Sequence, residues 1–144
     1  MGSRHASRML ALQALYALEM NAEAATGEVV ESAWGESGEA GADREFLEAL
    51  VAGAWRKRRD IDRELERVSK NWKLSRMDRI DKSILRLAAY ELLHTAETPL
   101  PVILDEAVEL AKEFGTPESP SFINGILDRI AREARPEEAV NRPS

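Results

Sequence analysis

The sequence predicts an all-α protein of six or seven helices, and three observations support this fold class. Apolar residues recur at spacings of three and four through most of the chain, which is the period of an amphipathic helix. Glycine and proline punctuate these segments, and no segment shows the alternating pattern of a strand. The chain has 144 residues, which is enough for one compact domain without a disulfide or metal.

The first half of the chain is expected to contain helices separated by one long loop. Thr26 and Asp43 are N-cap candidates, because their side-chain oxygens can accept a hydrogen bond from an unpaired backbone N–H. The expected segments are a helix over 4–21, a helix over 26–34, a glycine-rich surface loop over 35–42 and a helical stretch over 43–73. The sequence leaves open whether the last stretch is one kinked helix or two abutting helices.

The second half carries further helix boundaries. Ser75 and Asp78 resemble a capping box, and Ser119 followed by Pro120 predicts an N-cap with a proline in the first turn. Gly115 is expected to end a helix in the left-handed conformation. The expected segments are helices over 75–94, 102–114 and 120–135, followed by a frayed tail over 136–144.

The stretch SPSFINGILDRI contains an Asn-Gly pair, which often marks a hairpin. Here the apolar positions follow the helix period, so the pair lies near the beginning of a helix. Gly125 inside a helix costs about 1 kcal/mol relative to alanine. We expect either a close approach by a neighbouring helix or an RNA backbone, or relief of crowding, to explain this glycine.

Composition limits the function classes. The absence of cysteine excludes disulfides and thiolate zinc sites and favours an intracellular protein. No apolar run reaches the length of a membrane span and no signal-peptide layout is present, so we expect a cytoplasmic protein. The net charge of -6 argues against indiscriminate nucleic-acid binding, although 1–22 and 54–82 are locally basic.

No residue pattern indicates an enzyme, a metal site or a cofactor. Glu91 and His94 have the i, i+3 spacing of di-iron bundles, but that chemistry needs a second such pair and two more glutamates. His5, the other histidine, has no matching glutamate. No phosphate-binding glycine loop, zinc-protease motif or activated nucleophile is present.

Two basic stretches are candidates for RNA contact. In RKRRDIDRELERVSKNWKLSR the bases alternate with acids at helical spacings, which favours a solvated helix face over an auxiliary RNA or protein contact. At the beginning of the chain, Arg4, His5 and Arg8 share one half of a helical wheel with Gln13 and Tyr16. Cations beside a stackable ring suit single-stranded nucleic acid.

Three stretches resemble the NusB transcription antitermination family: RHASRMLALQALYALE, DRIDKSILRLAAYELL and TPLPVILDEAVELAKEFGTPESPSFINGILDRI. The resemblance implies two packed helical subdomains, approximately 1–74 and 75–135, without enzymatic activity. It also implies an adaptor that binds boxA RNA of ribosomal RNA leader transcripts together with the ribosomal protein NusE. This complex would assemble on elongating RNA polymerase with other Nus factors. Some family members form homodimers, so the oligomeric state stays open.

The resemblance implies two candidate surfaces. The RNA-binding candidates are Arg4, His5, Arg8, Gln13, Tyr16, Glu118, Phe122, Asn124 and Asp128. The NusE-binding candidates are Tyr16, Asp81, Arg86 and Tyr90. The basic opening carries fewer arginines than is usual in the family, so we expect weak RNA binding alone and a gain with NusE.

The alternative is a helical module that binds only proteins, like the NusB-like domain of some ribosomal RNA methyltransferases. Such a module would have no RNA specificity of its own. This chain carries neither the cysteine nucleophile nor the catalytic domain of those enzymes, which favours the RNA-binding adaptor.

Overall fold

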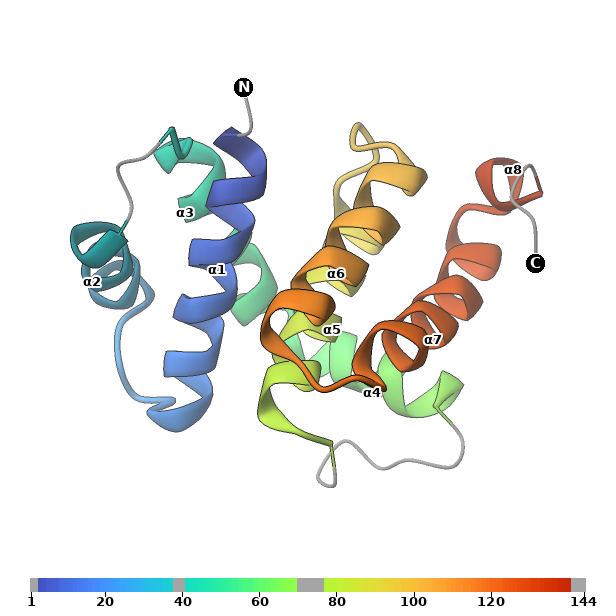
Figure 1. Ribbon diagram of the computed structural model, residues 1–144, viewed down its shortest axis with the longest axis horizontal. Coiled ribbons are helices and arrows are strands. Elements are labelled where there is room, and N and C mark those ends of the chain that lie inside the picture. Colours follow the sequence, from blue (N-terminus) through green and yellow to red (C-terminus); the bar gives the residue numbers. More distant parts are fainter. Residues whose placement is uncertain (1–2, 38–40, 70–76, 141–144) are drawn as a thin grey trace. The chain divides into compact units, whose positions relative to one another are not determined.

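The computed structural model describes residues 3–37, 41–69 and 77–140. These residues form eight helices and no strand, which confirms the all-α class (Figure 1). Backbone contacts divide the chain into two compact units, Met1–Arg58 and Arg59–Ser144. The subdomain boundary that we expected near residue 74 lies outside the described residues.

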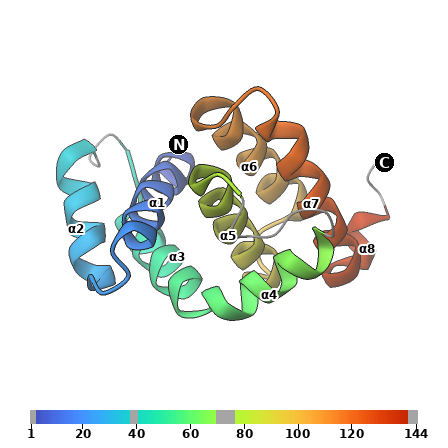
Figure 2. The ribbon, with the colours of Figure 1, turned by 90° about the horizontal axis from the view of Figure 1, so that it is seen from below.

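The first unit contains three helices that pack on one another (Figure 2). They are α1 (Ser3–Met20), α2 (Thr26–Ser37) and α3 (Arg44–Arg56). Helix α2 continues three residues beyond its expected end at Trp34, because one glycine, Gly35, costs a helix only about 1 kcal/mol. Thr26 is the first residue of α2 rather than the residue that precedes it.

A side-chain contact joins α1 to the beginning of α3. Asp43 is the N-cap of α3, as predicted, and its Oδ1 accepts a hydrogen bond from Phe46 N at 3.1 Å. Ser7 Oγ accepts from Asp43 N at 2.8 Å and donates to Asp43 O at 2.9 Å. These bonds hold the first turn of α3 beside the basic part of α1.

The second unit contains the remaining helices. They are α4 (Arg58–Val68), which begins at the last residue of the first unit, α5 (Arg79–His94), α6 (Leu100–Phe114), α7 (Ser119–Ala134) and α8 (Pro136–Ala139). Helices α5, α6 and α7 pack on one another, and α8 packs on α7. Lys57 separates α3 from α4 and donates its N–H to Gly53 O, so the stretch contains two helices rather than one.

Polar contacts attach α4 to the second unit. Arg86 of α5 donates from Nε and Nη2 to the two carboxylate oxygens of Asp62, at 2.8 Å each. Arg129 of α7 donates from Nη1 to Val68 O, at the C-terminal end of α4, at 2.8 Å. A two-pronged arginine–carboxylate contact of this kind fixes orientation as well as distance.

Two predicted helix beginnings were wrong in detail. Asp78 is itself the N-cap of α5 and accepts from Ile80 N at 2.8 Å, whereas Ser75 lies outside the described residues. Helix α6 begins at Leu100, two residues before the expected position, because Pro101 falls in the first turn, where it needs no hydrogen bond.

The predictions for Gly115 and Ser119 were also wrong. Gly115 has φ −96° and ψ −161°, which is extended and not left-handed. A Cβ at this position would lie 2.6 Å from Ser119 Oγ and 2.8 Å from Ala111 O. Ser119 lies inside α7, where its Oγ accepts from Thr116 N at 2.9 Å and donates to Asp81 Oδ1 at 2.7 Å. Gly115 is therefore needed for a close approach rather than for its left-handed freedom.

Gly125 has the opposite environment. It is exposed within α7, and no atom of the described residues lies within 4 Å of the position of an added Cβ. Within the second unit, neither crowding nor a close neighbouring helix explains this glycine. An approach from outside the second unit, by a helix or by an RNA backbone, is the expectation that stays open.

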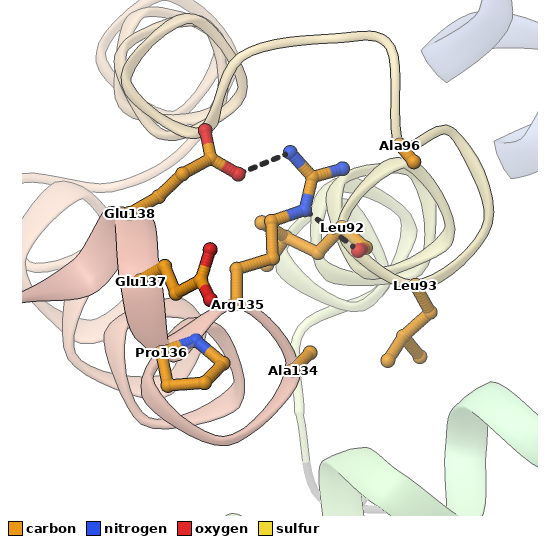
Figure 3. A pocket seen from close by; sticks show the side chains of 8 residues that line it. All are labelled: Leu92, Leu93, Ala96, Ala134, Arg135, Pro136, Glu137 and Glu138. Carbon is orange, nitrogen blue, oxygen red and sulfur yellow. Dashed lines mark hydrogen bonds and ion pairs between the residues drawn. The ribbon is translucent and has the colours of Figure 1, made fainter.

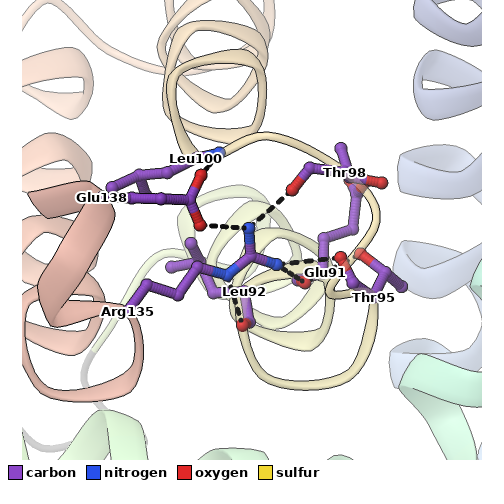
Figure 4. A network of polar contacts seen from close by, with 7 residues as sticks. All are labelled: Glu91, Leu92, Thr95, Thr98, Leu100, Arg135 and Glu138. Atoms are coloured by element: carbon purple, nitrogen blue, oxygen red, sulfur yellow. Dashed lines mark hydrogen bonds and ion pairs between the residues drawn. The ribbon is translucent and has the colours of Figure 1, made fainter.

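The expectation of a frayed tail was wrong for residues 136–140, while 141–144 lie outside the described residues. Residues Pro136–Ala139 form α8, and Ala139 is buried. Arg135 donates hydrogen bonds to the backbone oxygens of Glu91, Leu92, Thr95 and Thr98 and to Glu138 Oε1 (Figure 4). Arg135 therefore binds two carbonyls in the last turn of α5, where a helix runs short of partners, and two in the connection that follows it.

Glu138 completes this network. Its Oε2 accepts from Leu100 N at 2.9 Å, at the beginning of α6. A pocket of about 390 Å³ lies beside Arg135 and is bounded by the last turn of α5 and by 134–138 (Figure 3). The chain after α7 is thereby attached to two other helices of the second unit.

We expect Gly115→Ala and Gly125→Ala to change stability in opposite directions. The first adds a methyl group against Ser119 Oγ and Ala111 O, and overpacking of this kind costs about 1–3 kcal/mol. The second adds it in open space within a helix and should stabilise by about 1 kcal/mol. Urea unfolding followed by circular dichroism measures both. Equal effects of the two substitutions would contradict these roles.

We expect Arg135→Lys to lower the free energy of unfolding by about 2 kcal/mol, because an ammonium group has three donors and cannot reproduce the planar fork. Arg132→Lys is the matched control on the same helix, since Arg132 is exposed and pairs only with Asp128 among the contacts shown. The control should change stability by about 0.5 kcal/mol or less. Equal midpoints for the two variants in urea would show that Arg135 does not hold the end of α5.

Candidate nucleic-acid interface

The predicted RNA-side residues are divided between the two units. Arg4, His5, Arg8, Gln13 and Tyr16 lie on α1 in the first unit. Glu118, Phe122, Asn124 and Asp128 lie at and after the beginning of α7 in the second unit. Each group is described here within its own unit.

The basic beginning of α1 lies against an aromatic ring of α3. Arg4 is exposed, and its Cζ lies 4.3 Å from the centroid of the Phe46 ring. Arg8, one turn later, has its Cζ 5.2 Å from the same centroid, but only 3% of Arg8 is exposed. The expectation that Arg8 is an open surface cation was therefore wrong, because Arg8 lies on the face of α1 that contacts α3.

The other α1 candidates are more exposed than Arg8. Gln13 is exposed, while His5 and Tyr16 are half-buried. Gln13 also lines a groove of about 230 Å³ formed with α2. The exposed part of α1 thus offers a guanidinium, an amide and part of a phenol ring along one helix.

Two of the α7 candidates, Glu118 and Phe122, line a mostly apolar pocket of about 360 Å³. Its other lining residues are Met77, Asp78, Asp81, Thr116 and Ser119. Asn124 is half-buried and is not part of the pocket lining. Asp128 forms an ion pair with Arg132 at 2.9 Å, so its charge is already balanced.

The NusE-side candidates differ in exposure. Asp81 and Arg86 are 8% and 7% exposed, so they are not open surface residues as we expected. Both have partners within the second unit, since Asp81 accepts from buried Ser119 and Arg86 binds half-buried Asp62. Tyr90 is half-buried, and its ring centroid lies 5.4 Å from that of His94.

Burial raises the pKa of Asp81. Removal from water disfavours the carboxylate and raises the pKa of Asp81 above its usual value, and the nearby charge of Asp78 acts in the same direction. The hydrogen bond from Ser119 opposes the shift only in part. Asp81 is therefore a structural group whose ionisation disfavours folding.

Two arginines of the basic run, both in α4, are paired with carboxylates. Arg63 binds Asp60, and Arg67 binds Glu64 and Glu133. These pairs are those of a solvated helix face, although 70–76 of the run lie outside the described residues. Arg67 also lines a cleft of about 430 Å³ between α4 and α7.

The described residues contain no cluster of three or more histidine, cysteine or acidic side chains placed to hold a metal ion. Glu91, one member of the i, i+3 pair, is buried, whereas His94 is exposed. Within the same residues, no helix is both long enough and apolar enough to span a membrane.

Comparison with known proteins identifies the family. A profile described as the NusB family matches residues 5–132. The chain belongs to the NusB family. The transcription antitermination protein NusB of Myxococcus xanthus (strain DK1622) is 47% identical over 147 residues, covering 99% of this chain and 100% of that protein. The chain is accordingly an antitermination factor and not an enzyme.

Solved NusB structures share the fold. A structure of T. maritima NusB has a TM-score of 0.84 and 33% identity, and covers 96% of this chain and 97% of that one. A crystal structure of antitermination factors NusB and NusE in complex with double-stranded RNA has a TM-score of 0.80 and 24% identity. That alignment covers 92% of this chain and 98% of that one, and shows likeness of fold.

Sequence reasoning missed three residues that organise these surfaces. Phe46 is one of the apolar residues of α3, and its ring contacts both arginines of α1. Ser7 and Ser119 form long-range hydrogen bonds that no local pattern indicates. The one available signal was the position of Phe46 in the first turn after the Asp43 cap.

We expect Ser119→Ala to lower the free energy of unfolding by about 1–3 kcal/mol, because it leaves buried Asp81 and Thr116 N without their partner.

Asp81→Asn keeps an acceptor for Ser119 and removes the charge that burial disfavours, so the stability of this variant at pH 7 should equal or exceed that of the native chain. The raised pKa means that the folded state binds this proton more tightly, so native stability falls as pH rises through the interval above the usual value of 3.8.

The stability difference between the Asp81→Asn variant and the native chain should therefore shrink as the pH is lowered toward and below that interval. Urea unfolding of both proteins at several pH values measures this difference. A variant that loses stability at pH 7 and recovers it in acid would contradict the assignment.

Proposed function

We propose that this protein is an RNA-binding adaptor that binds boxA RNA of ribosomal RNA leader transcripts together with NusE and acts on elongating RNA polymerase. The observation that carries the proposal is the exposed Arg4 guanidinium over the Phe46 ring at the beginning of α1. Membership of an antitermination family supports the same conclusion.

The geometry at Arg4 suits a phosphate. A guanidinium that lies over an aromatic ring uses its face for that contact and keeps its N–H edges for hydrogen bonds. Those edges match the two oxygens of a phosphate, which favours a two-pronged contact. Gln13 and Tyr16 lie further along α1 and supply an amide and a ring for bases.

The α7 surface suits bases rather than phosphates. Phe122 borders an apolar pocket into which a flipped base can enter, and aromatic stacking is tolerant of base identity. Exposed Glu118 repels phosphate but can accept a hydrogen bond from a base amino group. In this proposal, phosphate contact falls to α1 and base contact falls mainly to α7.

The residues proposed to contact NusE are Tyr16 in the first unit and Tyr90 in the second, and each is half-buried and presents part of its ring. Asp81 and Arg86 support the second unit from within rather than contact the partner directly. The net charge of -6 makes the isolated chain a weak RNA ligand. The crystal structure of NusB and NusE in complex with double-stranded RNA, whose NusB-like fold this chain shares, supports a joint RNA-binding unit by analogy.

We expect Arg4→Gln to weaken boxA RNA binding several-fold and to reduce the slope of log affinity against log salt by about 0.7, because one phosphate contact is lost. Lys112→Gln removes the same charge from an exposed part of α6 and should leave both quantities nearly unchanged. Fluorescence anisotropy with boxA and scrambled oligonucleotides, with and without NusE, measures both. Equal binding of the two oligonucleotides under all conditions would overturn boxA specificity.

The alternative of a module that binds only proteins makes a different prediction. It requires that NusE is retained in a pull-down and that boxA RNA changes neither the retention nor the composition of the complex. The proposed adaptor requires that RNA and NusE each increase retention of the other, since binding free energies are reciprocally coupled.

A further inference from the structure

We infer that Phe46 is a positioning residue for RNA binding, because its ring holds the Arg4 guanidinium in place for a phosphate. The inference rests on the proposed RNA-binding function and adds a residue to it that the sequence analysis did not select. Phe46 itself is half-buried on α3. It acts through Arg4.

Hydrogen bonds at the beginning of α3 determine the position of the Phe46 ring. Asp43 caps α3 through Phe46 N, and Ser7 of α1 binds both the N–H and the carbonyl of Asp43. The residue that carries the ring is therefore tied through one cap to the helix that carries the arginines. This linkage places the ring beside Arg4, at the exposed beginning of α1.

Arg4 and Arg8 contact the ring in different environments. The contact with Arg8 is buried, whereas Arg4 is exposed. No carboxylate of the described residues is paired with Arg4, so its N–H edges are not consumed by an ion pair. The buried arginine and the cap hold the ring, and the ring in turn holds the exposed arginine.

The Phe46 ring should strengthen RNA binding because it restricts the Arg4 side chain before RNA binds. An exposed arginine samples many rotamers, and fixing them on binding opposes association. Attraction between the guanidinium and the ring face restricts those rotamers in the free protein. The orientation also leaves the hydrogen-bonding edges available. Loss of the ring should therefore weaken RNA binding although the charge of Arg4 is retained.

The test is a double-mutant cycle in the full chain, with boxA RNA as ligand and with NusE present in parallel titrations. Phe46→Leu removes the ring and keeps an apolar side chain, and Phe46→Tyr keeps the ring. We expect Phe46→Leu to weaken binding by about threefold, and Phe46→Tyr to bind like the native chain. Arg4→Gln should weaken binding less in the Phe46→Leu background than in the native one.

The salt dependence separates positioning from charge. Phe46→Leu should leave the slope of log affinity against log salt unchanged, because Arg4 keeps its charge, whereas Arg4→Gln should reduce it. Thermal unfolding of each variant confirms that titrations are made on folded protein. A general structural defect would lower affinity in both backgrounds alike and give no coupling to Arg4.

The outcomes distinguish the inference from the function on which it rests. Additive effects of Phe46→Leu and Arg4→Gln would overturn the positioning role, and so would equal losses for Phe46→Leu and Phe46→Tyr. If Arg4→Gln weakens binding while Phe46→Leu does not, the RNA-binding proposal stands and the inference is wrong. If the native chain does not bind boxA RNA even with NusE, the proposed function itself fails.

Discussion

The structure depends on how the backbone groups at its helix ends are satisfied. An α-helix leaves about four N–H groups and four carbonyls without partners inside the helix. Here, side chains supply partners at helix ends and in the connections beside them: Ser7 at Asp43, Ser119 at Thr116 before α7, and Arg135 at Leu92 O in the last turn of α5. Each of these side chains also ties together parts of the chain that are distant in sequence. The same contacts therefore end the helices and hold each unit together.

Helix positions were largely predictable, because periodicity and capping are local properties of the sequence. Asp43 caps α3 as expected. Gly115 and Ser119 were misassigned, because the residue types that favour a left-handed end or an N-cap also suit a tight contact or a long-range hydrogen bond. Which use applies depends on Asp81, 38 residues away. The ordered structure after α7 was not predicted for the same reason, since the carbonyls that Arg135 binds are distant in sequence.

The candidate surfaces were predictable in composition but not in exposure. A helical wheel groups Arg4 with Arg8, yet only the packing of α3 decides that Arg4 is open and Arg8 is covered. Asp81 and Arg86 were similarly selected by resemblance, yet both are buried and are engaged by Ser119 and Asp62. In an acidic chain, most arginines are engaged by carboxylates or carbonyls. An exposed arginine held by a ring is thus distinguished by its environment rather than by its residue type.

The open space at Gly125 has a practical consequence. The chain contains no cysteine, so a thiol introduced at this position would be the sole attachment point for a maleimide dye or spin label. The position lies on the solvent side of α7, one residue after Asn124, and an added side chain there displaces no described atom. A reporter could therefore be placed next to the α7 surface while the interior of the second unit stays intact.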